Sequence, residues 1–448
     1  MIPPRNEPRR RGYCPGVLAP MEVGDGLLVR VRVPAGILAA GQARRIAALG
    51  RELGNGLVDL SHRGNLQLRG LSADGLRPLY SALESLGLLA ADVESEAVRN
   101  VLTAPAAGLD PQGFDVRAAA LALDARLAAD ERVRGLTPKF GWLVCGGGAG
   151  HLADSSTDVR FDAVPDDSGA GGDGFVFRVA LGGTLAAAVP IGLCAPAQVA
   201  GVAAGIARTF IALRAGREAA PRRMAGLIRE TGVGAFAALP GLVPLADPTP
   251  PVRPPRAVLG VRPDWLGVAF PFGRLDVDRL EALAGLAERQ GSGEIRLTPW
   301  RALLLPGVTE GVGALALGGV LDPADVRLRL TACSGIGGCD VGTTDTHADA
   351  LELARRAPAL VAAVTAVHVS GCAKGCAHPA PAAVTLTARG GRYGVDVNAA
   401  PSDAARWPDL SPAQAVDKVA SLDALYRART VAGEGAETFL STLPPADL

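Results

Sequence analysis

Four cysteines in the last third of the chain have the spacing of a metal-binding site. Five residues separate Cys333 from Cys339, three separate Cys372 from Cys376, and 32 lie between the two pairs. Glycines fill the loops between these sulfurs: Gly335, Gly337, Gly338, Gly371 and Gly375. A cluster needs a backbone that curls round it and points N–H groups at its sulfur atoms, which glycine permits without strain. The pattern therefore favours a [4Fe–4S] cluster held by four thiolates.

Two other chemistries fit these cysteines less well. Two disulfides would need an oxidising compartment, and the Arg-rich start of the chain is not followed by the apolar segment and cleavage site of a secretory signal. Structural zinc commonly uses tighter C-x2-C or C-x4-C knuckles. The remaining cysteines, Cys14, Cys145 and Cys194, are isolated, and we expect them to be buried thiols.

Composition excludes several classes of function. The chain has 448 residues, of which 48% are hydrophobic and 20% charged, so it can bury large cores and is not a disordered protein. Its 45 basic and 45 acidic residues cancel, which gives nucleic-acid binding no electrostatic support. No apolar run free of charges and helix breakers reaches a membrane-spanning length, so we expect a cytoplasmic protein without a membrane helix.

The elements that must position these loops occur twice. A strand (23–33), a helix (37–53), an alternating strand (57–71) and a helix (74–90) come first. A second strand, helix and strand follow at 265–273, 276–290 and 294–308. The segments LVDLSHRGNLQLRGL and EIRLTPWRALLLPGV align, which indicates an internal duplication.

The duplication extends to the cysteine loops. Residues 101–113 resemble 330–342, and 142–155 resemble 367–380. The first copy keeps the glycines but lacks the cluster cysteines, so we expect it to form a binding wall and no cluster. Around these repeats the sequence predicts an exposed loop (163–174), a Pro-rich linker ending near 258, a helix (345–357), a strand pair joined by Gly390-Gly391 and a final helix (412–428).

The motif C-x5-C followed by G-C-x3-C-x-x-P resembles the sulfite/nitrite reductase superfamily, and the likeness covers nearly the whole chain. It implies an α+β fold of two pseudo-symmetric halves, each with a small ferredoxin-like half-domain and a larger α+β domain. The expected divisions are 14–92 and 93–215, a linker at 216–257, then 258–322 and 323–448, the last with the [4Fe–4S] site. The resemblance also places Cys376 where superfamily members bridge the cluster to a sirohaem iron.

The same resemblance assigns roles to basic side chains. Residues 62–69 match the motif R-x-N-x-Q, whose side chains face the tetrapyrrole and substrate in that superfamily, although a polar face of a half-exposed strand would look the same. The likeness implies a catalytic role for Arg63 of this motif. It implies the same for Arg99 and Lys139, which lie elsewhere in the chain. A second lysine of the superfamily is replaced by Gly141, which weakens a sulfite or nitrite reductase assignment and predicts space for a larger substrate.

A narrower resemblance rests on RRGYCPGVLAPMEVGDGLLVRV and SGCAKGCAHP. These segments are similar to the branch of the superfamily that acts on corrin precursors in aerobic cobalamin biosynthesis. The likeness implies O2-dependent hydroxylation and lactone formation on precorrin-3A, with an NADH-linked electron donor. The substrate's carboxylates would then meet Arg63, Asn65, Gln67, Arg69 and Lys374, with Arg99, Lys139 and Arg301 as further basic partners.

Oxygen activation in that branch suggests a mononuclear non-haem iron beside the cluster, for which His62, His151 and His378 are candidate ligands. Two other functions stay open at this point. One is a sirohaem-dependent sulfite or nitrite reductase. The other is a non-catalytic electron carrier, which would not need a pocket lined with anion-binding side chains.

Overall fold

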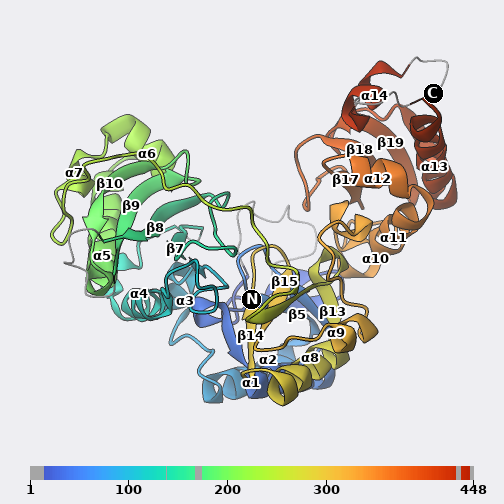
Figure 1. Ribbon diagram of the computed structural model, residues 1–448. Coiled ribbons are helices and arrows are strands. Elements are labelled where there is room, and N and C mark those ends of the chain that lie inside the picture. Colours follow the sequence, from blue (N-terminus) through green and yellow to red (C-terminus); the bar gives the residue numbers. More distant parts are fainter. Residues whose placement is uncertain (1–14, 138, 167–173, 430–434, 444–448) are drawn as a thin grey trace. The chain divides into compact units, whose positions relative to one another are not determined.

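The computed structural model describes residues 15–137, 139–166, 174–429 and 435–443 (Figure 1). The basic start of the chain and Cys14 lie outside these residues. Contacts divide the chain into two compact units. Leu28–Val268 and Leu275–Leu317 make up most of the first, and Glu22–Leu27, Ala269–Arg274 and Gly318–Leu448 make up the second.

Two small sheets come from the two repeats, and each takes one short strand from the other repeat. The first has the order β1-β2-β5-β4-β13, with β1 (Met21–Val23), β2 (Gly26–Val31), β5 (Leu66–Leu71), β4 (Leu57–Leu60) and β13 (Arg274–Asp276). The second has the order β11-β12-β15-β14-β3, with β11 (Gly260–Val261), β12 (Trp265–Ala269), β15 (Ala302–Pro306), β14 (Glu294–Leu297) and β3 (Ile37–Ala39). This reciprocal exchange of β3 and β13 between the two sheets agrees with the internal duplication predicted from the sequence.

Two sequence predictions were wrong in this region. Residues 37–39 were expected in a helix but form β3, because they pair with β14 far along the chain, with Leu38 opposite Ile295. Residues 294–308 were expected as one strand, yet they form the hairpin β14–β15, and 57–71 form the hairpin β4–β5 in the same way. In both stretches, the alternation of apolar and polar residues did not reveal the short polar turn that separates the two strands.

Helices cover these sheets with their apolar stripes. The helices are α1 (Ala40–Leu53), α2 (Ala73–Ser85), α8 (Val277–Gln290) and the short α9 (Val312–Ala316). Equivalent helices α1 and α8 run side by side (Figure 1), and surface ion pairs such as Arg51–Asp278 join them. Short 3-10 turns at Pro34–Gly36 and Pro271–Gly273 each place their middle residue, Ala35 or Phe272, at a positive φ.

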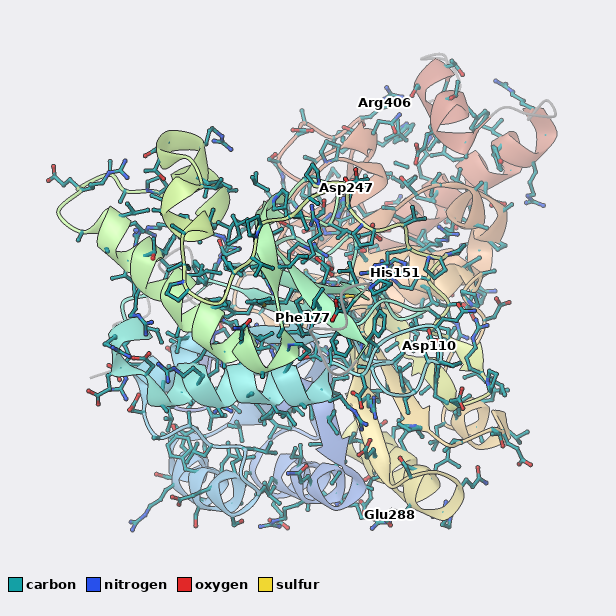
Figure 2. All side chains as sticks on the ribbon, turned by 60° about the vertical axis from the view of Figure 1, so that its left-hand side comes forward. Asp110, His151, Phe177, Asp247, Glu288 and Arg406 are labelled. Carbon is teal, nitrogen blue, oxygen red and sulfur yellow. The ribbon has the colours of Figure 1, made fainter. Side chains whose placement is uncertain are left out.

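The larger sheet of the first unit has the order β10-β9-β8-β7-β6. Its strands are β6 (Val101–Thr103), β7 (Trp142–Cys145), β8 (Thr157–Pro165), β9 (Phe175–Gly183) and β10 (Val189–Cys194). Strands β6, β7 and β8 are parallel, and β9 and β10 complete the sheet antiparallel. The helices of this part are α3 (Val93–Val98), α4 (Arg117–Ala129), α5 (Val199–Arg214), α6 (Met224–Thr231) and α7 (Gly234–Ala237), with 3-10 turns at Glu131–Val133 and Pro196–Gln198. Phe177 of β9 (labelled in Figure 2) is fully buried in the core between this sheet and its helices.

One helix in the described part of the chain, Pro196–Arg214, is long and apolar enough to cross a membrane, which the sequence analysis did not expect. Its buried face belongs to the core of the larger sheet, through Val199, Val202, Ile206 and Phe210. A core helix of a globular domain passes the same test of length and composition. Packing therefore accounts for its apolar character.

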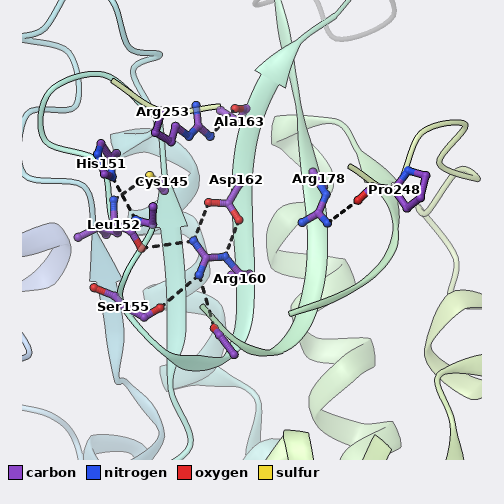
Figure 3. A network of polar contacts seen from close by, with 12 residues as sticks. Cys145, His151, Leu152, Ser155, Arg160, Asp162, Ala163, Arg178, Pro248 and Arg253 are labelled. Carbon is purple, nitrogen blue, oxygen red and sulfur yellow. Dashed lines mark hydrogen bonds and ion pairs between the residues drawn. The ribbon is translucent and has the colours of Figure 1, made fainter. Parts of the chain in front are cut away.

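The segment predicted as a linker contains α6 and α7, and Met224, Leu227 and Phe236 of these helices are buried in the same core. Its Pro-rich end is held along the sheet by backbone carbonyls, which proline retains although it lacks an N–H. Arg178 donates to the carbonyl of Pro248 at 2.9 Å (Figure 3). His151 Nε2 lies 2.9 Å from the carbonyl oxygen of Pro254.

The sheet of the second unit repeats the topology of β6–β10. Its order is β16-β17-β18-β19-β20, with β16 (Leu330–Ala332), β17 (Val367–Ser370), β18 (Ala382–Arg389), β19 (Arg392–Ala399) and β20 (Trp407–Leu410). The first three strands are again parallel and the last two antiparallel. The helices are α10 (Gly335–Gly338), α11 (Thr346–Arg356), α12 (Pro358–Ala363), α13 (Pro412–Arg429) and α14 (Ala436–Thr442), with a 3-10 turn at Val326–Arg329. The predicted helix at 345–357, the Gly-Gly hairpin and the final helix are confirmed.

Candidate functional site: a four-cysteine site and a basic hairpin

The four cysteines of the motif follow two neighbouring parallel strands. Cys333 comes directly after β16, and Cys372 comes two residues after β17 ends. Because the carboxyl ends of parallel strands meet at one edge of a sheet, the two loops lie together. Gly335 and Gly337, at φ values of 60° and 82°, let the first loop curl through α10 to Cys339.

Cys376 interacts electrostatically with the other three cysteines, and the loop backbone donates to one of the sulfurs. Gly371 donates its N–H to the Sγ of Cys333 at 3.1 Å. Burial raises the pKa of the Cys376 thiol, Cys372, Cys339 and Cys333 raise it further, and Lys374 opposes them. None of the six described cysteines is in a disulfide.

The loops present four cysteine sulfurs and a backbone N–H directed at one of them. Among the described residues, no group of three or more His, Cys, Asp or Glu side chains is close enough to hold one metal ion. The N–H of Gly371 is the kind of donor that cluster sulfurs accept. Two side-chain hydroxyls brace the loops, with Thr346 Oγ1 donating to the Cys333 carbonyl at 2.5 Å and Ser370 Oγ to the Cys372 carbonyl at 2.7 Å.

In the first repeat, a buried ion pair on β8 braces the loop that follows β7 (Figure 3). Arg160 and Asp162 of β8 are both fully buried, with Nε and Oδ2 2.6 Å apart. Arg160 also donates to the carbonyls of Leu152 and Ser155, at 3.3 and 3.2 Å. The loop after β7 is therefore fixed by a buried arginine. Cys145 Sγ accepts the N–H of Leu152, at 3.4 Å.

The glycine loop is held by contacts with Asp110 and His151, both of which are labelled in Figure 2. Asp110 Oδ2 accepts the N–H of Ala149 at 2.5 Å, and the N–H of His151 donates to Gly148 at 3.3 Å. Gly147 and Gly148 have φ values of 86° and 66°, which a residue with a Cβ adopts only with strain. The loop is thus a closed turn with internal partners.

Three of the predicted binding residues lie together in the first unit, beside the hairpin between β4 and β5. Arg63, Asn65 and Arg99 line one cavity of about 10 Å³, together with Arg32 and Asp124. That volume holds about one water molecule. The cavity therefore cannot admit a tetrapyrrole, and larger ligands can only meet these side chains from their solvent-facing sides.

Two of these contacts were missed by sequence reasoning. Arg99 makes a two-pronged contact with Asp124, in which Nε donates to Oδ1 at 3.2 Å and Nη2 donates to Oδ2 at 2.5 Å. Arg32, buried at the end of β2, donates to the side chain of Asn100. The only sequence signal for these contacts was the alternation of Arg30 and Arg32 in VRVRV. Asn100 and Asp124 are far in sequence from the arginines that they contact.

Arg63 occupies the space that the absent lysine at Gly141 was expected to leave open. A Cβ built on Gly141 would lie 2.9 Å from Arg63 Nη1 and 3.0 Å from Thr157 Oγ1. The expectation of free space at this position is therefore wrong, since a cation from the β4–β5 hairpin fills it.

The other predicted substrate-binding residues differ in how well they can reach a ligand. Gln67 is half-buried opposite Asp59 on the polar face of the sheet, and Arg69 is 4% exposed and 3.4 Å from Asp59. Lys139 is exposed in the first unit. Lys374 is exposed in the second unit, between Cys372 and Cys376.

The candidate iron-binding histidines have other contacts. In His151, Nε2 faces the Pro254 carbonyl and Nδ1 accepts the N–H of Ala153 at 3.3 Å, so both nitrogens are engaged. His62 Nδ1 lies 3.3 Å from the Pro299 carbonyl, and His378 Nε2 lies 3.4 Å from that of Pro381. These contacts give a mononuclear iron no support from the described residues.

Comparisons with known proteins agree with the two repeats. The profile of the family described as the nitrite/sulfite reductase ferredoxin-like half domain matches residues 19–86 and 263–312. Those ranges contain the two hairpins and the helices α1 and α8. The family thus accounts for the duplicated part of the first unit.

Similar proteins match most of the chain. A precorrin-3B synthase from Sinorhizobium sp is 31% identical over 98% of this chain and 93% of its own length. A ferredoxin–nitrite reductase from Synechococcus elongatus is 27% identical over 80% of this chain and 75% of its own. The structure of the NirA protein of Mycobacterium tuberculosis has a TM-score of 0.70 at 22% identity, over 94% of this chain and 84% of its own. That likeness concerns the fold.

Proposed function

Because the chain belongs to the precorrin-3B synthase family of the nitrite/sulfite reductase superfamily, we propose that it converts precorrin-3A to precorrin-3B by O2-dependent hydroxylation and lactone formation. The observation that carries this proposal is the match to a precorrin-3B synthase along 98% of the chain. The ferredoxin–nitrite reductase from Synechococcus elongatus, by comparison, aligns with 80% of it.

The cysteines supply the redox part of the proposal. Cys333, Cys339, Cys372 and Cys376 would hold a [4Fe–4S] cluster, which provides one-electron transfer when bound. The chain's own contribution is to hold four thiols on two braced loops and to direct the Gly371 N–H at the Cys333 sulfur. Burial raises the pKa of the Cys376 thiol, and the positive charge of Lys374 offsets part of that effect.

The hairpin supplies the binding part. Precorrin-3A carries acetate and propionate groups, and Arg63, Gln67 and Lys139 keep enough exposure to meet them. Asn65 and Arg69 are buried behind them, Arg69 against Asp59. Arg99 is held by Asp124, so we assign it to fixing the wall of the cavity. An NADH-linked donor would deliver the electrons.

The test is a product analysis under labelled O2. Protein purified without oxygen should convert precorrin-3A to a product heavier by one oxygen atom, and that atom should come from the labelled gas. Cys376→Ser should abolish the conversion, whereas Cys194→Ala, a buried thiol outside the site, should not. Reduction of sulfite or nitrite with a dye donor, without precorrin turnover, would instead support a sirohaem-dependent reductase.

A further inference from the structure

The hairpin loops of the two repeats have the same construction. In residues 61–65, Ser61 Oγ accepts the N–H of Asn65 at 3.1 Å and of Arg63 at 3.4 Å. In residues 298–302, Thr298 Oγ1 accepts the N–H of Ala302 at 3.1 Å and of Trp300 at 3.3 Å. The fourth residue of each loop is left-handed, with φ of 62° at Gly64 and 60° at Arg301. The loop shape therefore demands a positive φ at this position.

Glycine meets that demand in the first loop, but the second loop has arginine. A Cβ on Gly64 would meet nothing closer than 3.6 Å, so the backbone angle alone explains the glycine there. An arginine in the same conformation brings its Cβ close to its own carbonyl and is strained. Strained residues persist where their surroundings fix them, and they cluster at ligand sites.

Packing fixes the second loop in this conformation. The neighbouring Trp300 lies under the guanidinium of Arg256, 4.4 Å from the ring centre. Trp300 also packs against two small cores, which include Leu143 and Trp265. The loop is thus held on both sides of its strained residue, and the Arg301 side chain starts from a rigid base.

The loop that carries Arg301 contacts a basic side chain of the first loop. His62 Nδ1 faces the Pro299 carbonyl at 3.3 Å, so the two loops touch. Partial burial of the ring and then the charge of Arg301 lower the pKa of His62. His62 is nevertheless exposed, and Arg301 is half-buried with its Nε covered, so a ligand would meet Arg301 through the terminal nitrogens of the guanidinium. Each repeat thus contributes one basic side chain to the same spot.

We propose that Arg301, with His62 beside it, binds a peripheral carboxylate of the tetrapyrrole substrate, and that this contact is why a strained arginine stands where the first repeat has glycine. The planar guanidinium offers two parallel N–H donors to a carboxylate. Nε2 is the His62 nitrogen left for the ligand, because Nδ1 faces Pro299. The inference rests on the proposed function and names one residue pair for its substrate.

The test separates strain from binding. Uroporphyrin III, a stable tetrapyrrole with acetate and propionate groups, replaces the substrate in fluorescence titrations of the full chain. Arg301→Gly should melt at the same temperature as the wild type or higher, because glycine relieves the strain, and should bind uroporphyrin III at least about tenfold more weakly. Arg301→Lys should retain most of the affinity. Asp409→Gly, at an exposed position with φ of 58°, relieves strain elsewhere and should leave the affinity unchanged.

Three results would count against the inference. Binding by Arg301→Gly within twofold of the wild type would overturn it while leaving the proposed function intact. A lower melting temperature of Arg301→Gly would show that the arginine is kept for the fold. Failure of the wild type to bind uroporphyrin III would contradict the proposed substrate class, and the inference would fall with it.

Discussion

The guanidinium of Arg63 lies directly over Gly141, with Nη1 2.9 Å from where a Cβ at that glycine would be. Arg63 belongs to the β4–β5 hairpin, and Gly141 directly precedes β7. Their proximity therefore cannot be inferred from the sequence. Glycine at 141 therefore positions the arginine that the motif singled out.

Substituting Gly141 tests this relationship. Gly141→Ala should push Arg63 aside and weaken uroporphyrin III binding by roughly tenfold, since small displacements of a binding group have large effects. Gly201→Ala in α5 is the control, because a Cβ there meets no atom within 4 Å. The control should keep its affinity and melt no lower than the wild type. Unchanged affinity in Gly141→Ala would show that Arg63 does not contact the ligand.

Arg99 and Asp124 should behave as a buried pair. Their side chains are 13% and 10% exposed, so either single alanine substitution leaves a charge without its partner and should cost about 3–5 kcal/mol. The double substitution should cost less than the two single values together, by about 1 kcal/mol or more. Denaturant unfolding of the four proteins measures this coupling. If the free-energy costs of the two single substitutions simply add in the double variant, the pair does not hold the cavity wall.

Asp130 should make stability depend on pH. The hydrogen bond from Arg132 is the largest of several effects that lower the pKa of Asp130 from 3.8 to about 2. A carboxyl with a lowered folded pKa stabilises the protein above its unfolded pKa. That contribution should be lost as pH falls from near 4 to about 2. The stability difference between the wild type and Asp130→Asn should shrink over this window, and a constant difference would contradict the assignment. Asp417→Asn, at an exposed ion pair, is the control.

His368 should weaken the fold of the second unit. It is fully buried on β17, and neither ring nitrogen has a hydrogen-bond partner in the described part of the chain. Leu143 occupies the corresponding position on β7. His368→Leu should therefore stabilise the protein prepared without metal, by about 1 kcal/mol. Leu143→His should do the reverse, and a lower melting temperature of His368→Leu would show that the histidine has a partner in solution.

The sequence predicted those parts of the molecule that depend on local spacing. The glycine-separated cysteines, the duplicated elements and the motif around Arg63 could all be recognised from residue order. The exchange of β3 and β13 could not, because it depends on pairing between strands more than 200 residues apart. The same limit hid Asp124 as the partner of Arg99 and Arg63 as the occupant of the space at Gly141. Strain at Arg301 was equally invisible, since only the backbone angle shows it.

The most direct test of the account is the absorption spectrum, with iron and acid-labile sulfide analysis, of protein purified without oxygen. The account predicts a broad cluster band, about four irons and four sulfides per chain, and no tetrapyrrole bands. Cys376→Ser should reduce both contents. Sharp sirohaem bands would point to a sulfite or nitrite reductase. Zinc in place of iron, or no metal at all, would contradict the assignment of the four cysteines.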